Sequence, residues 1–266
     1  MKKYKIAIIF GGKSTEYGVS LQSASAILEN LNQEKYEIVL IGITRQGDWY
    51  HYKGSFDKIS ENTWYKNSEE LVPVVVSQNP SVAGIIELSE EGTKMIKLDF
   101  AFPVLHGKNG EDGTLQGLFE LAGIPVIGCD TLASALCMDK DRAHKLVEAA
   151  GIKAPKAVVL KSGQGENARV LTKDLEYPLF VKPVRAGSSF GITKIYKKEE
   201  LQPAVDRAFV HDREVIVEEN IEGFEVGCAV LGIDELLVGR VDEIELTDGF
   251  FDYTEKYTLK SSRIHM

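Results

Sequence analysis

The stretch from Phe180 to Thr193 holds the residues whose types and spacing best suit phosphate chemistry. The residues before Lys182 are apolar and favour a strand, so Lys182 would stand where a buried strand ends, with Pro183 ending the pairing. Glycine lets backbone N–H groups approach a polyphosphate closely, and short side chains follow at Gly187, Ser188, Ser189 and Gly191. The Walker sequence is absent. A phosphate clamp and a polar hairpin turn beside a surface lysine both fit these residues.

Two other glycine-bearing loops follow predicted strands. The loop at residues 10–20 contains Glu16, whose charge would repel a pyrophosphate and suits the ammonium group of a ligand. A solvated loop charge is the alternative for Glu16. The loop at residues 103–113 carries His106 and an acidic pair ahead of a predicted helix, which a structural histidine and the helix dipole also explain. Because both loops would lie at one edge of a sheet, they indicate a ligand pocket there.

Further charged residues suit a nucleotide. Lys140 and Lys182 come from separate elements, as the neutralisation of a triphosphate requires. Residues 215–221 end a predicted strand in polar groups, including Glu218, and Glu225 follows shortly. Such acceptors suit an adenine amino group and a ribose, although an exposed acidic strand end explains each of them equally well.

An aromatic and charged segment at residues 250–257 follows a turn signal at residues 247–249. Exposed aromatic side chains on a loop favour a lid over a cleft. A packed surface loop is the alternative.

The predicted elements place these loops in two kinds of domain. The apolar run at residues 5–10 predicts a buried parallel strand, and helical spacing at residues 19–31 predicts the helix after it. The first part is therefore predicted to be a doubly wound α/β domain, with hairpins in residues 46–97. After a boundary near residue 130, strands outnumber crossover helices and predict an α+β domain. Strands are also predicted at 37–44, 99–105, 124–127, 157–160, 179–182, 192–196, 215–219, 226–232 and 235–243, and helices at 115–122, 139–150 and 198–210.

Composition narrows the class of protein. The chain has 266 residues, a net charge of -9 and a pI near 5.2, which argues against nucleic-acid binding, because phosphate backbones select basic faces. The three cysteines lack metal-site spacing, so we expect small buried side chains in a reducing cytosol and no metal ligands among them. The apolar run near the N-terminus is too short for a signal peptide or a membrane span. We expect a cytoplasmic protein.

The segments, in this order, resemble the D-alanine:D-alanine ligase family of the ATP-grasp superfamily. The resemblance runs from Ile6 to Met266 and rests on FGGKSTEYGVS, PVLHGKNGEDGTLQG, MDK, VKPVRAGSSFGIT, VEENIEGFEVG and DGFFDYTEKY. It implies a Rossmann-like N-terminal α/β domain followed by an α+β ATP-grasp domain that is incomplete at its C-terminal end. The implied limits are residues 1–130 for the first domain, 131–222 for the central ATP-grasp subdomain and 223–266 for the start of the C-terminal subdomain.

The resemblance also implies a reaction and its residues. ATP would phosphorylate the carboxylate of a first D-alanine, and the amine of a second D-amino acid would attack the acyl phosphate. Catalytic roles fall to Glu16, Ser188 and Tyr257, linked by hydrogen bonds when the lid closes, and substrate contacts to Glu16, Tyr17 and His106. The implied ATP contacts are Lys140, Lys182, Ser188, Ser189, Gly191, Glu218, Glu219, Ile221, Glu225 and Lys256. ATP, D-amino acids, Mg²⁺ and a second copy of the chain in a homodimer are the implied partners.

Three departures from the family pattern refine this expectation. Tyr17 stands where ordinary D-alanine:D-alanine ligases usually carry His, and residues 225–232 resemble the vancomycin-resistance ligases more closely. Tyr257 argues against D-lactate as the acceptor. A VanG-type D-alanine:D-serine ligase is therefore the first hypothesis.

The alternatives are a housekeeping D-alanine:D-alanine ligase, another ATP-grasp carboxylate–amine ligase and a non-catalytic nucleotide-binding fragment. The family's Arg-x-Asp and Glu-x-Asn strands, which carry the Mg²⁺ ligands, do not follow the lid segment before Met266. We therefore expect the metal ligands beyond the end of this chain, and little or no ligase activity from these residues alone.

Overall fold

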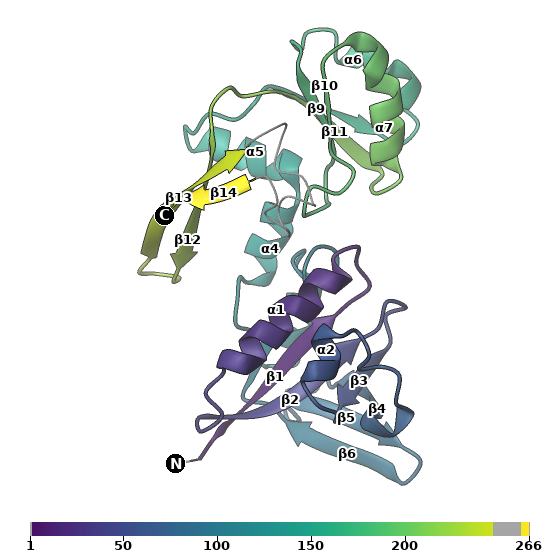
Figure 1. The fold of residues 1–266 in the computed structure, drawn as a ribbon, viewed down its shortest axis with the longest axis vertical. Coiled ribbons are helices and arrows are strands. Elements are labelled where there is room, and N and C mark those ends of the chain that lie inside the picture. The colour runs from purple at the N-terminus through teal and green to yellow at the C-terminus, as the bar shows by residue number, and fades with distance from the viewer. Residues whose placement is uncertain (1, 247–261, 266) are drawn as a thin grey trace. The chain divides into compact units, whose positions relative to one another are not determined.

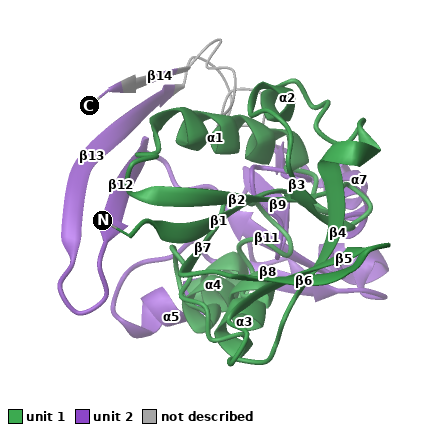
Figure 2. Ribbon diagram, turned by 90° about the horizontal axis from the view of Figure 1, so that it is seen from below, with its two compact units in different colours: residues 1–143 green, residues 144–266 purple. Residues whose placement is uncertain are grey.

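The computed structural model describes residues 2–246 and 262–265. The chain forms two compact units, residues 1–143 and 144–266, which Figure 2 shows in green and purple. The described strands form one sheet in the first unit and two in the second. Within these residues, no helix is both long and apolar enough to cross a membrane.

The first unit is built on a seven-stranded sheet in the order β6-β5-β4-β3-β2-β1-β7 (Figure 1). Its parallel part consists of β1 (Tyr4–Gly11), β2 (Tyr36–Ile43) and β7 (Phe100–Pro103). Ala7 of β1 lies between Val39 of β2 and Ala101 of β7, so β1 is a central strand, as its apolar run predicts.

Four antiparallel strands extend this sheet beyond β2. They are β3 (Trp49–Tyr52), β4 (Leu71–Val76), β5 (Gly84–Ser89) and β6 (Gly92–Lys97). The connection from β3 to β4 contains α2 (Asp57–Ser60) and a 3₁₀ turn, Ser68–Glu70. The hairpins predicted for residues 46–97 are confirmed.

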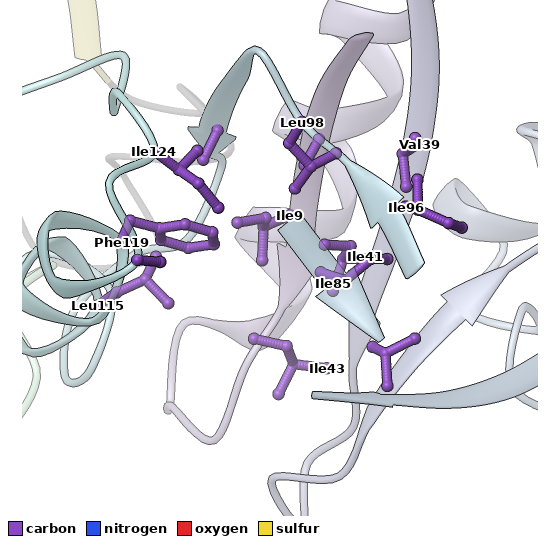
Figure 3. Close-up of a cluster of buried hydrophobic side chains, with 14 of the residues drawn as sticks. Ile9, Val39, Ile41, Ile43, Ile85, Ile96, Leu98, Leu115, Phe119 and Ile124 are labelled. Atoms are coloured by element: carbon purple, nitrogen blue, oxygen red, sulfur yellow. The ribbon is translucent and has the colours of Figure 1, made fainter. Parts of the chain in front are cut away.

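Alternate side chains of β1 enter two separate hydrophobic cores, one on each face of the sheet. Ala7 and Ile9 pack in the core that contains α3 (Thr114–Leu121), and Figure 3 shows the Phe119 ring of α3 facing Ile9. Ile8 and Phe10 pack in the other core with α1 (Tyr17–Asn30). Full burial of such a side chain stabilises the fold by about 1.5–3 kcal/mol, so helices on both faces fix the sheet and the loops at its edge.

The second unit contains a four-stranded antiparallel sheet in the order β10-β9-β11-β8. Its strands are β8 (Ala157–Lys161), β9 (Leu179–Pro183), β10 (Thr193–Ile195) and β11 (Glu214–Glu219). Two helices, α6 (Ala168–Leu171) and α7 (Leu201–Phe209), share its core, and the 3₁₀ turns Gly165–Asn167 and Lys198–Glu200 precede them. The antiparallel pairing confirms the α+β prediction for this part.

A three-stranded antiparallel sheet completes the second unit. It is formed by β12 (Glu225–Leu231), β13 (Leu237–Leu246) and β14 (Ser262–His265), in that order. Two further helices come near the point where the chain passes from the first unit to the second. The helix α4 (Thr131–Met138) belongs to the first unit, and α5 (Lys140–Ala149) contains the division after residue 143.

One predicted strand was wrong, and one helix was not predicted. Residues 124–127 do not form a strand, because only Val126 bridges to Ala101. Pro183 is the last residue of β9 and lies opposite Val215 in the last pair of the ladder with β11, so the prediction that it ends the pairing is confirmed. The helix α4 was not predicted, although Asp130 caps it by accepting from the Ala133 N–H over 2.7 Å.

The cysteines were also predicted wrongly. Cys129, Cys137 and Cys228 are exposed free thiols. Cys129 precedes α4, Cys137 lies on α4, where Ser134 is the buried residue, and Cys228 lies on the largely exposed strand β12. Cysteine is commonly buried, but here none of the three lies on a face that packs against a core.

Candidate functional site

A cavity of about 310 Å³ opens on the four-stranded sheet of the second unit. Its size lies in the range of small-molecule sites. The lining residues are Pro155, Phe180, Lys182, Ser189, Ile192, Glu218, Glu219, Ile221 and Glu225. Six of them were predicted from the sequence as nucleotide contacts: Lys182, Ser189, Glu218, Glu219, Ile221 and Glu225.

Strand pairing explains why Lys182 and Glu218 meet in this cavity. Phe180 of β9 lies directly opposite Glu218 of β11, and Lys182 is two residues further along β9. Residues two apart on a strand share a face, so Lys182 and Glu218 are diagonal neighbours within reach of each other. They form an ion pair between strands that are 36 residues apart in sequence.

The environment of Glu218 is more informative than its position in the sequence. Its side chain is buried, with 4% of the residue exposed, and one carboxylate oxygen pairs with Lys182. The other oxygen, Oε2, has no hydrogen-bond partner among the described residues, and Nε2 of His144 lies 3.8 Å away. A buried acceptor without a donor is costly, and a ligand N–H would satisfy it.

The loop after β9 carries unusual backbone angles. Ser188 and Ser189 adopt positive φ angles of 48° and 59°, a region that residues other than glycine seldom occupy. Gly191 follows with a φ of 70°. Ser188 is buried, whereas Ser189 lines the cavity. The predicted small-residue loop therefore forms part of the cavity wall, through Ser189 rather than through Gly191.

The far end of β11 supplies the other polar residues of the cavity. Glu219 accepts a hydrogen bond from the Glu176 N–H over 3.0 Å, which orients its carboxylate. Ile221 is 69% exposed and offers an apolar surface, and Glu225 is exposed at the start of β12. One end of the cavity thus combines an apolar side chain with carboxylates, and the other end carries Lys182.

In the first unit, Glu16 lies at the end of the loop between β1 and α1. Its side chain is buried, with 3% of the residue exposed, so the alternative of a solvated loop charge is wrong. The hydroxyl of Ser14 accepts from the Glu16 N–H over 3.1 Å and donates to the His106 carbonyl over 2.8 Å. A Cβ added to Gly107 would lie 1.9 Å from Glu16 Oε2, so the glycine leaves room for this carboxylate.

His106 belongs to the same group of residues. Its Nε2 lies 3.1 Å from the hydroxyl of Ser23 on α1, so the imidazole is held by a side chain of the neighbouring helix. The two acidic residues of its loop serve the backbone: Glu111 accepts from the Gly107 N–H over 2.7 Å and Asp112 from the Asn109 N–H over 2.8 Å. The tertiary structure therefore brings Glu16 and His106 together and uses the acidic pair to shape the loop.

Tyr17 points into the core rather than into this group. It is 1% exposed and its hydroxyl accepts a hydrogen bond from Trp64 Nε1 over 2.9 Å. Burial raises the pKa of Tyr17, against a smaller opposing effect of the Trp64 hydrogen bond and the Arg45 charge. The ring lies under the Arg45 guanidinium, 4.1 Å from its centre. A direct substrate contact by Tyr17 stays a prediction.

Three predicted residues remain: Lys140, Lys256 and Tyr257. Lys140 is the first residue of α5, whose start is capped by Asp139 through the Arg142 N–H over 3.0 Å. Lys256 and Tyr257, and with them the predicted lid, lie outside the described residues. Among the described residues, no group of three His, Cys, Asp or Glu side chains could hold a metal ion.

Several residues of these sites were missed from the sequence. Ser20 is fully buried; it accepts from the Gly11 N–H over 2.8 Å and donates to the Val104 carbonyl, so it joins the ends of β1 and β7. A serine within the apolar stripe of a predicted helix was the available signal for it. No local pattern marks Ser14, Pro155 or His144, because their partners are far away in sequence.

Two family models match the chain, and each match falls within one of the two units. Residues 5–129 match the family model described as the D-ala D-ala ligase N-terminus, and residues 146–266 match the model described as the D-ala D-ala ligase C-terminus.

Three relatives illustrate the match. The D-alanine–D-alanine ligase of Thermoanaerobacter sp. (strain X514) is 42% identical over 260 residues, which cover 97% of this chain and 72% of the relative. The vancomycin B-type resistance protein VanB of Enterococcus faecalis is 45% identical over 252 residues, covering 94% and 70%. The crystal structure of VanG D-Ala:D-Ser ligase from Enterococcus faecalis matches with a TM-score of 0.88 and 68% identity, covering 100% of this chain and 76% of that one.

Proposed function

Because this chain belongs to the D-alanine–D-alanine ligase family, we propose that it joins D-alanine to D-serine at the expense of ATP. The dipeptide D-alanyl-D-serine would enter peptidoglycan precursors in the cytoplasm and confer resistance to vancomycin. One observation carries the choice of acceptor: identity to the VanG D-Ala:D-Ser ligase is 68% over the whole chain, against 42% to the Thermoanaerobacter D-alanine–D-alanine ligase.

The cavity of the second unit fits a nucleotide. Lys182 supplies a cation for a phosphate group, and the unpaired Oε2 of Glu218 is an acceptor suited to the amino group of adenine. Glu225 and Ile221 line the same cavity; Glu225 would accept from ribose hydroxyls, and Ile221 would offer its apolar side chain to the base. Glu219 and Ser189 complete the wall, and Ser188 and Gly191 shape the loop beside them. A nucleotide would also relieve the cost of the buried acceptor on Glu218.

In the proposed reaction, an oxygen of the D-alanine carboxylate attacks the terminal phosphorus of ATP and ADP leaves. The amine of D-serine then attacks the carbonyl carbon of the acyl phosphate, loses a proton, and displaces inorganic phosphate. Charge on the transferred phosphoryl group is the main barrier, so cationic side chains such as Lys182, Lys140 and Lys256 are assigned to its neutralisation.

The amino-acid subsite is assigned to the first unit. The buried carboxylate of Glu16 would bind the ammonium group of D-alanine, a pairing that would stabilise both charges. His106, held by Ser23, would border the same subsite, and Tyr17 would support it from the core. Ser188 and Tyr257 remain proposed catalytic residues. The charge on the phosphates calls for Mg²⁺, and no group of described residues is assigned to hold it.

The test is a competition between acceptors. The full-length protein is incubated with ATP, D-alanine and D-serine at equal concentrations near pH 7, and the dipeptides are separated by mass and counted against phosphate release. The proposal requires D-alanyl-D-serine as the main product. D-alanyl-D-alanine as the main product would favour a housekeeping ligase, and phosphate release without dipeptide would contradict both.

A homodimer is proposed as the assembly, as for the family in general. Sedimentation of the purified protein at micromolar concentration checks it, and a monomer mass at all concentrations would contradict it.

A further inference from the structure

The loop that carries two of the cavity-lining residues lies beside a turn whose own residues do not line the cavity. We call residues 186–192, which contain the lining residues Ser189 and Ile192, the pocket loop. We call residues 211–214, which lead from α7 into the first residue of β11, the support turn. The pocket loop begins directly after Arg185, and the support turn contacts Arg185 on one side of the loop and lies beside Phe190 and Gly191 near the other.

The first contact is made by Asp212 of the support turn. Its Oδ2 accepts from the Arg185 N–H over 2.8 Å and from Arg185 Nε over 3.1 Å, and its Oδ1 accepts from Arg185 Nη2 over 2.7 Å. The Glu214 N–H donates to the same Oδ1 over 3.2 Å. Such paired hydrogen bonds between Arg and a carboxylate fix orientation as well as distance.

Charge and burial strengthen this arrangement. The Asp212 side chain is 8% exposed, and the Arg185 guanidinium also reaches Glu214 Oε2 over 2.9 Å. Burial acts to raise the pKa of Asp212, but the hydrogen bonds from Arg185 and Glu214 and the Arg185 charge together lower it. Asp212 is therefore an ionised carboxylate that accepts four hydrogen bonds.

The second contact is made by His211 near the other end of the pocket loop. Its Cδ2 would lie 2.6 Å from a Cβ on Gly191, and its ring centre is 6.5 Å from that of Phe190. Between the two contacts, Ser188 and Ser189 hold positive φ angles. Each such residue costs about 1–3 kcal/mol and persists only where the surrounding structure enforces it. Turn hydrogen bonds inside the loop, from Phe190 N–H to the Gly187 carbonyl and from Ile192 N–H to the Ser189 carbonyl, and the contacts of the support turn on either side both act on this segment.

We propose that Asp212 is a positioning residue for the ATP site: acting through Arg185, it holds the pocket loop so that Ser189 faces the phosphates. This inference rests on the proposed function, because the ATP site is part of that proposal. Asp212 itself contacts neither ATP nor the reacting atoms in this scheme.

The test replaces Asp212 by Asn, which keeps the shape but removes the charge and one acceptor. We expect the KM for ATP to rise on the order of tenfold while the KM for D-alanine stays within twofold. Amide hydrogen exchange without nucleotide should become faster in residues 186–192. Asp206→Asn is the matched control, since Asp206 is exposed on α7 and accepts a hydrogen bond from Gln202 over 2.8 Å.

A second, milder variant separates the proposed effect from a general loss of folding. Arg185→Lys keeps the backbone N–H bond to Asp212 and the positive charge but loses the paired geometry, so a smaller shift in the same direction is expected. Unchanged KM for ATP and unchanged loop exchange in both variants would overturn the proposal. If the wild-type protein does not use ATP, the proposed function fails, and the exchange of the pocket loop still decides whether Asp212 positions it.

Discussion

The indole N–H of Trp64 donates to the hydroxyl of Tyr17 over 2.9 Å, and both side chains are buried. Phe10 lies against the Trp64 ring edge to face, with ring centres 5.0 Å apart. The start of α1, directly after Glu16, is therefore fixed by an aromatic core and not only by its loop.

Replacing Tyr17 by Phe should destabilise the first unit by about 1–3 kcal/mol, because the buried Trp64 N–H loses its acceptor. Urea unfolding followed by Trp fluorescence measures this change. Tyr65→Phe is the control, since Tyr65 also contacts Trp64 but is 44% exposed. Equal stability of the Tyr17→Phe variant and the control would contradict the role assigned to the hydrogen bond.

Replacing Lys182 by Met should lower nucleotide affinity and destabilise the second unit by about 3–5 kcal/mol, because Glu218 would remain buried without its cation. Thermal unfolding and calorimetric titration with ATP measure the two effects. Adding Glu218→Gln to the variant should recover most of the stability but not the affinity.

Lys194→Met is the control for that experiment. Lys182 Nζ lies over the Phe180 ring, 4.9 Å from its centre, and Lys194 Nζ lies over the same ring at 5.2 Å, but Lys194 is not among the cavity residues. A loss of stability as large in this variant as in Lys182→Met would show that the cation–ring contact, and not the ion pair with Glu218, is responsible.

Replacing Gly191 by Ala should weaken ATP binding. This effect on binding should exceed the effect of the substitution on the stability of the rest of the protein. Its φ is +70°, and the new Cβ would lie 2.6 Å from His211 Cδ2 and 2.8 Å from Pro183 Cγ. Gly163→Ala separates the causes, since Gly163 has a φ of +88° with nothing within 4 Å of an added Cβ. The control should show only the backbone cost of about 1 kcal/mol, whereas equal ATP affinity in both variants would rule out the steric effect.

The first unit should lose stability on acidification through His51. Its Nδ1 lies 2.6 Å from Glu87 Oε1, and Lys53 Nζ lies 2.8 Å from the same oxygen. Burial lowers the pKa of His51, while Glu87 raises it and Lys53 and Lys94 lower it further; the net shift is downward from 6.5. The unfolded chain therefore binds the proton first, so this contribution is complete above pH 6.5 and is lost as the pH falls through the folded pKa.

Glu87 should cause a second loss of stability, in a more acidic pH range. Burial acts to raise its pKa, but hydrogen bonds and charge from Lys53 and His51 lower it below 4.5 overall. Its contribution is present above pH 4.5 and is lost as the pH falls through the folded value. Melting temperatures between pH 8 and pH 3.5 should show both losses; His51→Gln should remove the first and Glu87→Gln should change the second. Glu90→Gln in the exposed turn of the same hairpin should follow the wild-type curve.

The sequence by itself determined most of the strands and helices, the α/β and α+β halves, and the membership of a ligase family. Hydrophobic period and glycine placement are local properties, so the segment at residues 5–10 and the following helix could be predicted from neighbouring residues alone. Six cavity residues were also predicted, from polar groups at the ends of recognisable strands and from the family resemblance.

Only the tertiary structure decided which charges meet. The Lys182–Glu218 pair depends on the register between β9 and β11, and the Arg185–Asp212 pair joins residues 27 apart in sequence. Burial of Glu16 against Gly107, and exposure of all three cysteines, likewise follow from which faces pack together. A side chain's residue type gives its chemistry, but its charge partner and its contact with water are set by segments distant in the chain, and a single sequence carries no local signal for them.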